Sequence, residues 1–546
     1  MSSSKGGPNR SSRRARSKAS WRTWVRPTTV SGWSRCARRP ASCWKRFTNS
    51  HRYCAGRCTT SIISTSRNGR SGSACSYGLS SIPTRHDRTI SSTERARTRM
   101  TQPAVSSSKA DRGWFGHPRG LSTLFFTEMW ERFSFYGLRA LLVLYMTAAV
   151  AKGGLAFTAE RASNIVGWYG FGVYAAAIPG GWIADRLLGQ YRSVFVGGVI
   201  IAMGHFSMAI PTEATFFLGL CLIVIGTGLL KPNISTMVGA LYDTDDERRD
   251  AGFSIFYMGI NLGAFIAPLV VGTLGQKVDW HVGFGCAGVG MVAGLIQYVV
   301  GRPRLMPALQ RLGQTEKGAA PTTPTEPWWH FTRDEWNRIL AIAVLFVFSS
   351  IFWGAFEQAA SSLNLFADRL TNNRAFGYGF PSTWYQSLNS MFMIFGLAPL
   401  LAWLWIRLGP RQPSSPVKFA LGLIFVGLGF ALIIPAARIA QQQGVLVSPW
   451  WLVGLYFLHT IGELCLSPVG LSIVTKLAPQ RVVGSMMGVW FLSIATGNKL
   501  AGFAGGFFDR MPLPTLFGAV ALTTFVAALV LLVMTPWIRK LMGGIL

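Results

Sequence analysis

The sequence predicts an all-α membrane protein with twelve transmembrane helices arranged in two six-helix halves. Three observations predict this fold class. Half of the 546 residues are apolar and only 14% are charged, against about 25% charged in an ordinary soluble domain. Apolar runs of about 20 residues, the length that crosses a bilayer core, recur twelve times from Leu121 onward. A polar segment divides these runs into two sets of six.

The two sets define the expected domains. We expect an N-terminal half at 117–301, with spans near 121–148, 163–184, 193–211, 215–239, 252–273 and 281–301. We expect a C-terminal half at 338–546, with spans near 338–365, 384–406, 417–438, 449–474, 483–507 and 514–537. Between them, residues 302–337 carry Pro, Thr and charge and predict a cytoplasmic linker that ends in the helix start TRDEWNR. Two six-span halves with a linker are typical of a transporter built from repeats.

Loop charges predict the orientation of the chain. One set of alternate loops, with Arg186, Arg248 and Arg249 among its members, is richer in Lys and Arg than the opposite set, which includes Lys152 and Lys277. Basic loops stay on the cytoplasmic side. We therefore expect a multi-pass protein of the inner (cytoplasmic) membrane, with both termini and the linker in the cytoplasm.

The N-terminal segment differs from the rest of the chain. The formal net charge is +31, and residues 1–100 hold 22 of the 53 Lys and Arg but only 2 of the 22 Asp and Glu. We expect residues 1–116 to be a disordered, basic extension, and we interpret residues 1–99 as an over-extended start before Met100. Its Arg- and Ser-rich, acid-poor composition leaves a transit peptide as one alternative and a nucleic-acid-binding tail as another. We expect no nucleic-acid partner.

Cysteine and histidine give only weak metal signals. Cys54 and Cys58, with His51 nearby, resemble half of a zinc site, but no second pair follows at finger spacing. His205 and His459 are lone histidines within spans, which are more often structural than proton relays. We find no catalytic or metal constellation, so we expect no enzyme activity, no metal and no cofactor.

The first span, TEMWERFSFYGLRALLVLY, carries four ionisable residues. These are Glu128, Glu131, Arg132 and Arg139, which lie together with Tyr136 on one helical face at 100° per residue. A charge at the bilayer centre costs at least about 2.5–3.5 kcal/mol. A stripe of mixed sign therefore has to face the interior of the bundle and indicates a functional site.

Later spans supply possible partners for this stripe. Lys231 follows GTGLL in the fourth span, Glu357 lies in FWGAFEQ, Glu463 in HTIGELCLSPVG and Lys499 in ATGNKLAG. One alternative is that these ions only pair with each other and hold the bundle together. Lys499 lies near a span end, where a lysine can snorkel to the surface.

Two further motifs concern packing and gating. Gly283, Gly285 and Gly288 form a GxGxxG string, but it lies within a span and favours close helix packing over nucleotide binding. The segment GGWIADRLLGQYR lies between the second and third spans. There Asp185, Arg186 and Gly189 are candidates for a conformational gate rather than for substrate contact.

Several segments together resemble the proton-coupled oligopeptide transporter family, a branch of the major facilitator superfamily. EMWERFSFYG resembles its first-span signature ExxERFxYYG, and RDAGFSIFYMGINLGAF resembles its fifth-span signature. GLLKPN, FEQAASSLNLFAD, WYQSLNS and GELCLSPVGLS are similar to its fourth, seventh, eighth and tenth spans. The resemblance runs from about residue 117 to the C-terminus. It implies the major facilitator fold and proton-coupled symport of di- and tripeptides by alternating access, in a functional monomer within the lipid bilayer.

The resemblance also implies a peptide-binding set in which basic residues hold the peptide carboxylate, acidic and amide residues hold its amino terminus, and aromatic residues form the pocket walls. These three groups are Arg132, Tyr136 and Lys231; Asn261, Asn389 and Glu463; and Tyr174, Trp353 and Trp490. A dipeptide presents one cation and one anion at a nearly fixed separation, so separate basic and acidic patches suit it.

Proton coupling is implied for a second, overlapping set. The family pattern places Glu128, Glu131 and Arg132 in proton exchange. It places Arg139 and Glu357 in a bridge between the halves that opens on protonation or binding.

The sequence departs from the family pattern at three places. Phe135 replaces the first Tyr of the signature, Ser390 follows Asn389 where Pro is common, and Ile494 follows WFLS where some members have a small polar residue. These changes bear on pocket shape and selectivity. Three alternatives stay open: transport of nitrate or another small anion, drug export, and a peptide sensor without transport.

Overall fold

The computed structural model describes residues 113–543, apart from 244–245, 319–329, 376 and 480–481. These residues belong to one compact unit that spans Ala104–Leu546. The predicted disordered extension is 1–116, and its residues 1–112 lie outside the described part of the chain. The described part is helical, with a single two-residue hairpin in which β1 (Arg374–Ala375) pairs antiparallel with β2 (Tyr378–Gly379).

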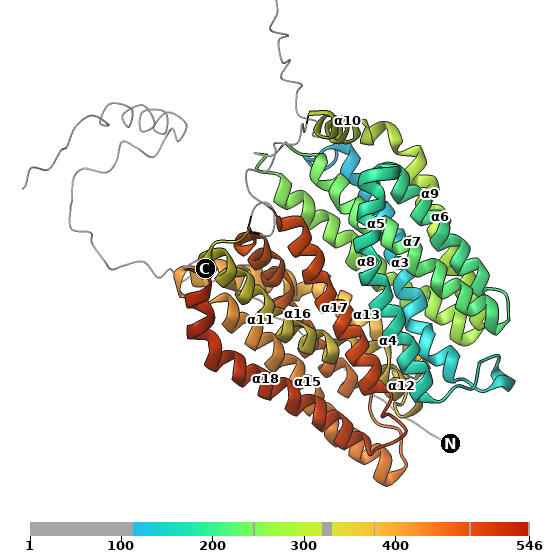
Figure 1. Cartoon of the computed structure of the whole chain (residues 1–546). Coiled ribbons are helices and arrows are strands. Elements are labelled where there is room, and N and C mark those ends of the chain that lie inside the picture. The colour runs from blue at the N-terminus through green and yellow to red at the C-terminus, as the bar shows by residue number, and fades with distance from the viewer. Residues whose placement is uncertain (1–112, 244–245, 319–329, 376, 480–481, 544–546) are drawn as a thin grey trace, which may run out of the picture. The chain divides into compact units, whose positions relative to one another are not determined.

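Helices α3 to α9 form the N-terminal half (Figure 1). They are α3 (Arg119–Thr147), α4 (Ala159–Ala175), α5 (Ala177–Ile183), α6 (Gln190–Met208), α7 (Glu213–Ala240), α8 (Arg249–Lys277) and α9 (Trp280–Val300). The second span is continued by the π-turn η2 (Ala184–Leu188), and a short 3-10 turn, η1 (Val150–Lys152), follows α3. Side-chain caps fix three helix starts, since Thr158, Thr212 and Asp279 accept hydrogen bonds from the first turns of α4, α7 and α9.

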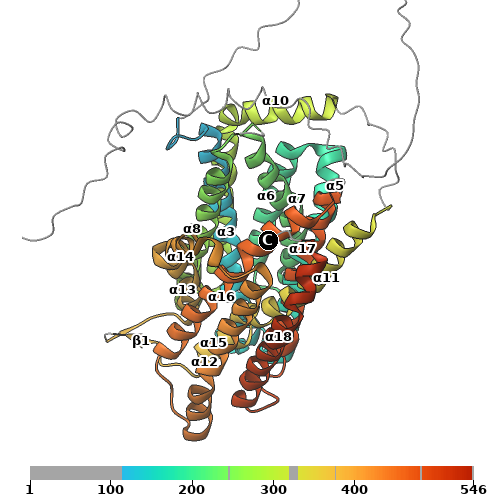
Figure 2. The ribbon, with the colours of Figure 1, turned by 90° about the vertical axis from the view of Figure 1, so that its left-hand side faces the viewer.

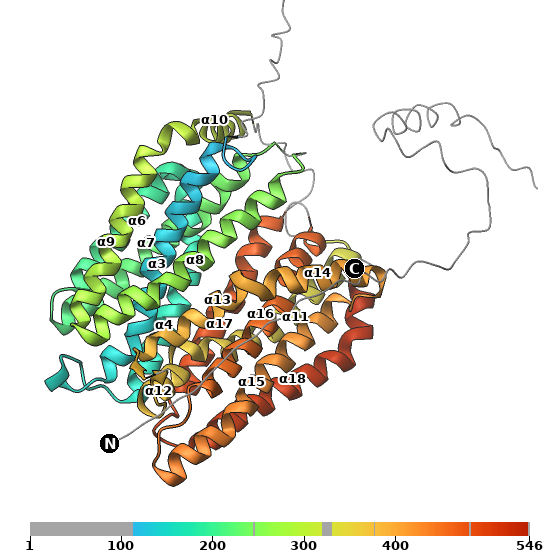
Figure 3. The ribbon, with the colours of Figure 1, turned by 180° about the vertical axis from the view of Figure 1, so that it is seen from behind.

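Helices α11 to α18 form the C-terminal half (Figure 3). Its spans are α11 (Arg333–Phe356) with η3 (Glu357–Ala360) and α12 (Ser362–Arg369); η4 (Ser382–Trp384) with α13 (Tyr385–Phe392), η5 (Met393–Leu397), α14 (Ala398–Leu408) and η6 (Gly409–Arg411); α15 (Ser415–Gln443); α16 (Trp450–Leu477); α17 (Val483–Gly505); and α18 (Leu513–Leu541). A capping box between Thr332 and Glu335 starts α11. Helix α11 therefore begins within TRDEWNR, the segment in which the sequence predicts a helix start.

Every predicted span coincides with one helix or with consecutive helical pieces. Within the described residues, eight helical segments are long and apolar enough to cross a membrane by length and composition alone. The first span does not meet that test because α3 carries Glu128, Glu131, Arg132 and Arg139. Together with the family assignment below, these helices give the predicted fold of twelve spans in two halves.

The segment between the halves contains a helix that the polar sequence did not predict. Helix α10 (Arg302–Gly318) lies across the helix ends of the N-terminal half (Figure 2). Its own residues Leu305 and Ala308 are fully buried. An added Cβ on Gly120 of α3 would lie 2.8 Å from the Arg304 carbonyl oxygen, so a glycine permits this approach. We call this end of the bundle the α10 end, and the opposite end, where α12 lies, the α12 end.

The two halves meet along seams between α4 and α17 and between α8 and α13. On the first seam, Gly502 of α17 lets the two helices pack closely, because an added Cβ there would lie 2.5 Å from the Ser163 carbonyl oxygen of α4. On the second seam, Ser387 donates a hydrogen bond to the Phe265 carbonyl at 2.8 Å, and the Trp384 indole donates to Thr273 at 2.8 Å. These seams bring residues far apart in sequence to one interior.

Glycines of α9 also mediate helix packing. An added Cβ on Gly283 would lie 2.9 Å from the Gly275 Cα of α8, and one on Gly288 would lie 3.0 Å from the Phe206 ring of α6. Gly285 is less crowded, with Ala209 at 3.6 Å. The GxGxxG string is thus part of helix contacts, as predicted.

Candidate functional site

Three charged side chains of α3 form one buried cluster. Glu128, Glu131 and Arg132 are each at most 2% exposed. The Arg132 guanidinium donates Nη2–H to Glu131 Oε1 at 2.6 Å, and its Nε contacts Glu131 Oε2. The same Nε lies 3.3 Å from Glu128 Oε1. Two carboxylates share one guanidinium, so the cluster has room for one more positive charge or proton.

The second carboxylate oxygen of Glu128 makes no hydrogen bond with Arg132. Glu128 Oε2 is buried and has no hydrogen-bond partner among the described residues. A buried carboxylate oxygen without a partner is costly. Protonation of Glu128, or the approach of a cation, would relieve that cost.

Lys231 of α7 brings a further positive charge toward α3. Its Nζ lies 4.1 Å from the centre of the Tyr174 ring of α4, a cation–π contact. Arg132, Glu131 and Glu128 lie within its electrostatic range. Within the described part of the chain, no carboxylate forms an ion pair with Lys231, so its charge stays available to an anionic ligand.

Arg139 of α3 pairs with Glu357 across the two halves. Arg139 Nη2 lies 2.5 Å from Glu357 Oε2, and the side chains are 13% and 8% exposed. Helix α11 ends at Phe356 and gives way to the 3-10 turn η3, which begins with Glu357. The backbone change therefore falls at the residue that carries the carboxylate. The predicted bridge between Arg139 and Glu357 is present.

Tyr136 lies on the same face of α3, between the two clusters. The Arg139 guanidinium lies 5.8 Å from the centre of its ring. Glu357 and Glu463 of the C-terminal half both lie within electrostatic range of its hydroxyl. Tyr136 thus faces the interior shared by both halves.

A second carboxylate site lies in the C-terminal half. The Asn389 amide of α13 donates to Glu463 Oε2 of α16 at 2.9 Å and contacts Thr460 Oγ1 at 3.2 Å. Thr460 in turn donates to the Tyr456 carbonyl at 2.7 Å. The structure thus brings together two of the three residues expected to hold an amino group.

The third of these residues, Asn261 of α8, makes a local contact instead. Its amide donates to the Tyr257 carbonyl one turn earlier, at 3.0 Å. Tyr257 reaches the other half, because its hydroxyl lies 3.4 Å from the Met393 sulfur. Asn261 is buried at 6% exposure.

The two candidate pocket tryptophans flank the contact between α11 and α17. Trp353 and Trp490 are 8% and 4% exposed. On the same two helices, the hydroxyls of Ser349 and Ser493 lie 2.9 Å apart. An added Cβ on Gly497 would lie 2.3 Å from the Trp353 Cβ, so this glycine lets the tryptophan backbone approach α17.

The candidate gate residues lie in and just beyond the π-turn η2, where the sequence predicted a loop. Asp185 Oδ1 accepts a hydrogen bond from Gln190 Nε2 at 3.0 Å, and the Arg186 guanidinium lies 5.8 Å from the Trp182 ring centre. Gly189 has φ +71°, a conformation that favours glycine. The helical path thus continues to Leu188 and turns at Gly189.

Lys499 lies beside α4 on the seam between the halves. Its Nζ is 3.4 Å from Asn164 Oδ1 and 4.2 Å from the Trp168 ring centre. An indole and an amide therefore solvate this ammonium group at the half-buried seam.

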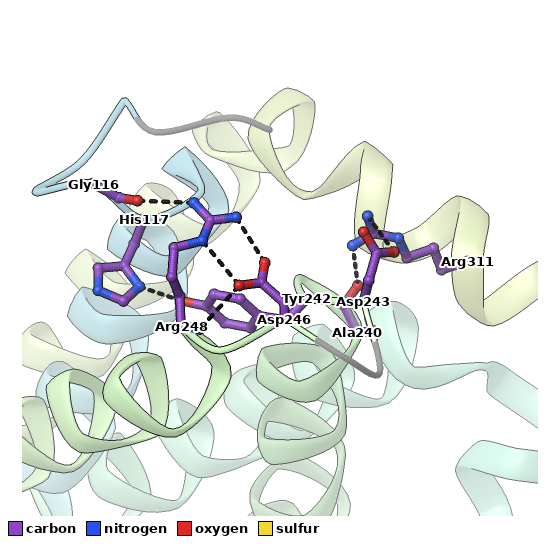
Figure 4. Close-up of polar contacts among 8 residues, drawn as sticks. All are labelled: Gly116, His117, Ala240, Tyr242, Asp243, Asp246, Arg248 and Arg311. Carbon is purple, nitrogen blue, oxygen red and sulfur yellow. Dashed lines mark hydrogen bonds and ion pairs between the residues drawn. The ribbon is translucent and has the colours of Figure 1, made fainter. Parts of the chain in front are cut away.

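A polar cluster at the α10 end joins the start of α3 to the connection between α7 and α8 (Figure 4). The His117 ring nitrogen Nδ1 lies 2.9 Å from the Tyr242 hydroxyl. Arg248 donates to the Gly116 carbonyl at 2.9 Å and binds both carboxylate oxygens of Asp246, at 3.0 and 2.7 Å. These hydrogen bonds from Arg248 lower the pKa of Asp246 to about 2, while burial and then the Arg248 charge lower the pKa of His117.

The same end is tied to α10 by Arg311. Its guanidinium donates to the Ala240 carbonyl at 3.1 Å and lies 3.0 Å from Asp243 (Figure 4). Neither this contact nor the cluster around Arg248 was predicted from the sequence. The only signal was the mixed charge of DTDDERRD, which resembles any solvated loop.

The interior therefore holds two charged regions, one in each half. On the N-terminal half, the cations Lys231 and Arg132 lie near the carboxylates Glu128 and Glu131, and on the C-terminal half the carboxylate of Glu463 is bonded only to Asn389 among the described residues. The pair between Arg139 and Glu357 joins the halves beside them. This arrangement in a helical membrane protein of two halves defines a membrane transporter.

The chain belongs to the POT family, whose profile matches residues 191–310 and 323–520. It is 40% identical over 504 residues to a peptide transporter of Yersinia enterocolitica, a match that covers 80% of this chain and 98% of that protein. A di-/tripeptide transporter of Lactococcus lactis is 36% identical, with 80% and 99% covered. The resemblance drawn from the motifs is confirmed.

Solved structures agree with this assignment. The peptide transporter POT in complex with sulfate shares 43% identity, covers 79% of this chain and 97% of that chain, and gives a TM-score of 0.71. A POT family transporter in complex with 5-aminolevulinic acid shares 32% identity, with 78% and 98% covered and a TM-score of 0.69. The predicted major facilitator fold is thereby confirmed.

Proposed function

We propose that this chain is a proton-coupled symporter that imports di- and tripeptides across the cytoplasmic membrane by alternating access. The observation that carries the proposal is the separation of charge between the halves. Lys231 presents a cation without a carboxylate partner among the described residues, and Glu463 presents a carboxylate hydrogen-bonded to Asn389. The names of the relatives, which include peptide and di-/tripeptide transporters, support the same substrate class.

A zwitterionic peptide matches these two regions. Its carboxylate would bind Lys231 and Arg132, with Tyr136 nearby, and its amino group would bind Glu463 and Asn389. Because each end contacts a different half, a bound peptide would draw the halves together. The side chains would lie against Trp353, Trp490 and Tyr174, where apolar contact tolerates many shapes. Asn261 is proposed to line the same interior.

Proton coupling would use the carboxylates that already share cations. Glu357 loses its charge when protonated, and its attraction to Arg139 falls from an ion pair to the weaker contact between a cation and a neutral carboxyl group. Glu128 and Glu131 share Arg132, so a proton on one of them would leave the guanidinium with one ionised carboxylate instead of two and strengthen its attraction for the peptide carboxylate. A proton thereby biases which arrangement of the halves is populated.

The proposal includes location and gating. We propose that the α10 end faces the cytoplasm, because Arg248, Arg302 and Arg311 lie there. Both termini would then be cytoplasmic, in a monomer that spans the inner membrane. Asp185, Arg186 and Gly189 would form part of the gate at that end. The proton gradient would drive the cycle, with no cofactor and no catalysed reaction.

Uptake into proteoliposomes tests the proposal. Vesicles with an acidic exterior and a neutral interior should accumulate labelled dipeptide above its outside concentration. A protonophore should abolish the accumulation while exchange of labelled for unlabelled peptide continues. Binding of peptide without accumulation would support a sensor instead. Uptake of nitrate but of no dipeptide would support an anion carrier.

A further inference from the structure

Helix α12 contacts α3 of the opposite half through a neutral side chain. The Asn364 amide donates to the Ala140 carbonyl of α3 at 2.9 Å. Asn364 is 1% exposed, and its Oδ1 is buried without a partner among the described residues. Ala140 is adjacent to Arg139, so this bond lies one residue from the ion pair between Arg139 and Glu357.

The end of α12 contacts a second helix of the N-terminal half. Gln276 of α8 donates to Asp368 Oδ1 at 3.1 Å and to Ser382 Oγ at 2.8 Å. Its carbonyl oxygen accepts from the Thr383 backbone N–H at 3.2 Å and from the Thr383 hydroxyl at 3.1 Å. One glutamine side chain therefore uses both its donor and its acceptor group across the boundary between the halves.

Helix α12 thus contacts the N-terminal half at two points. We call these two contacts, Asn364 with Ala140 and Asp368 with Gln276, the clasp. Asn364 and Asp368 are four residues apart and lie on one side of the helix. The first reaches α3 and the second reaches α8. Ser382 also donates to Asp368 at 2.8 Å, which fixes η4 against the end of α12.

The contact between Asn364 and Ala140 differs in chemistry from the nearby ion pair. The attraction between Arg139 and Glu357 depends on the charge of a carboxylate, whereas the amide of Asn364 and the carbonyl of Ala140 carry no titratable proton. Asp368 and Arg369 are the charged groups at the exposed end of α12. Protonation of Glu357 therefore leaves the Asn364 bond intact.

We propose that Asn364 and Gln276 are positioning residues that hold the two halves together at the α12 end, independently of the ion pair between Arg139 and Glu357. The inference rests on the proposed transport cycle for its functional meaning. Opening at the α12 end requires that both the clasp and the ion pair separate. The clasp thereby sets how readily the site becomes accessible from that end.

Distance measurement between spin labels tests the proposal without reference to transport. Lys152 in η1 and Val445 between α15 and α16 are exposed at the α12 end, one in each half. Lys152→Cys and Val445→Cys would be introduced in the full chain after the eight native cysteines are replaced. Pulsed electron double resonance then reports the fraction of molecules that are open at this end.

Asn364→Ala and Gln276→Leu are the two test variants. Asn373→Ala is the matched control, because its amide also donates to a carbonyl at 2.9 Å but within the C-terminal half, to Ala367. The loss of one net hydrogen bond in Asn364→Ala predicts an increase of about threefold to tenfold in the open-to-closed ratio. Gln276→Leu removes four hydrogen bonds between the halves and should raise the ratio at least as much. The control should leave the ratio unchanged. Gln276→Leu on α8 provides the test if Asn364→Ala does not fold.

Three results would overturn the proposal. These are an unchanged ratio in the folded test variants, an equal rise in Asn373→Ala, and a rise that requires Glu357→Gln in addition. If the wild-type chain accumulates no peptide, the proposed function fails. The spin-label ratio would still decide whether the clasp holds the halves together.

Discussion

Arg139 Nη2 in α3 lies 2.5 Å from Glu357 Oε2 in η3, so this ion pair connects the two halves of the transporter. Both side chains are mostly buried, which weakens screening by water and makes the loss of one partner costly, at about 3–5 kcal/mol for buried pairs. The pair is thus suited to respond to a change of charge on Glu357. Its effect on the cycle can be separated from its effect on binding.

Glu357→Gln should abolish accumulation of dipeptide but retain exchange. The amide keeps the shape of the carboxylate and an oxygen near Arg139, but it cannot take up or release a proton. Proteoliposome uptake under a proton gradient and counterflow without a gradient measure the two modes. Glu213→Gln is the control, because its pair with Arg161 is half exposed and such pairs contribute about 0–1 kcal/mol. Full accumulation by Glu357→Gln would exclude it as a coupling residue.

Glu463→Gln should weaken binding of peptides that have a free amino terminus. A charged hydrogen bond contributes about 1.5–3 kcal/mol, so the counterflow KM should rise by about 10-fold to 100-fold. N-acetylated peptides lack the cation, so their weaker inhibition should change little. Equal effects on both peptide types would assign Glu463 a structural role. Thr460→Val, which leaves the carboxylate in place, is the neighbouring control.

Lys231→Gln should affect the opposite end of the peptide. Because the Lys231 ammonium has no carboxylate partner among the described residues, we expect its removal to weaken peptides with a free carboxyl terminus by about 10-fold or more. Amidated peptides should lose little further affinity. Competition measurements with the two peptide forms decide this. An unchanged preference for the free carboxylate would shift the anion site to Arg132 alone.

Much of the fold and part of the site could be predicted from the sequence. Periodicity placed Glu128, Glu131, Arg132 and Arg139 on one face, and the structure buries that face. The pairing of Arg139 with Glu357 needed the family resemblance, because spacing along the chain does not show which carboxylate in the other half a cation reaches.

Other features had no usable signal in the sequence. Asn364 and Ala140 are 224 positions apart, and a lone amide in an apolar run has no charge to identify its partner. Helix α10 contains Pro303 and Pro307 and many polar residues, which resemble a linker. Its helical form depends on tertiary packing of Leu305 and Ala308, which local propensity does not report.

Gly497→Ala should destabilise the folded transporter. The added Cβ would lie 2.3 Å from the Trp353 Cβ, so α11 and α17 would have to separate. Overpacking of this kind costs about 1–3 kcal/mol. Thermal unfolding in detergent measures the effect. Gly484→Ala on the same helix is the control, since nothing lies within 4 Å of its added Cβ, and its Tm should stay level or rise. Equal Tm values for both variants would contradict the packing argument.

His117 should make the stability of the transporter depend on pH. Burial and the Arg248 charge lower the pKa of His117 in the folded chain, so the unfolded chain binds a proton that the folded chain resists. Stability is therefore fully present above the ordinary histidine pKa of about 6.5 and falls as the pH drops below it. We expect the fall in Tm between about pH 7.5 and about pH 5.5 to be smaller in His117→Gln than in the wild-type chain. Tyr242→Phe removes the hydrogen bond but keeps the imidazole, so it should lower the Tm by an amount equivalent to about 1 kcal/mol and retain the pH dependence. Identical pH profiles for the wild-type chain and His117→Gln would show that the polar cluster at the α10 end does not titrate in this range.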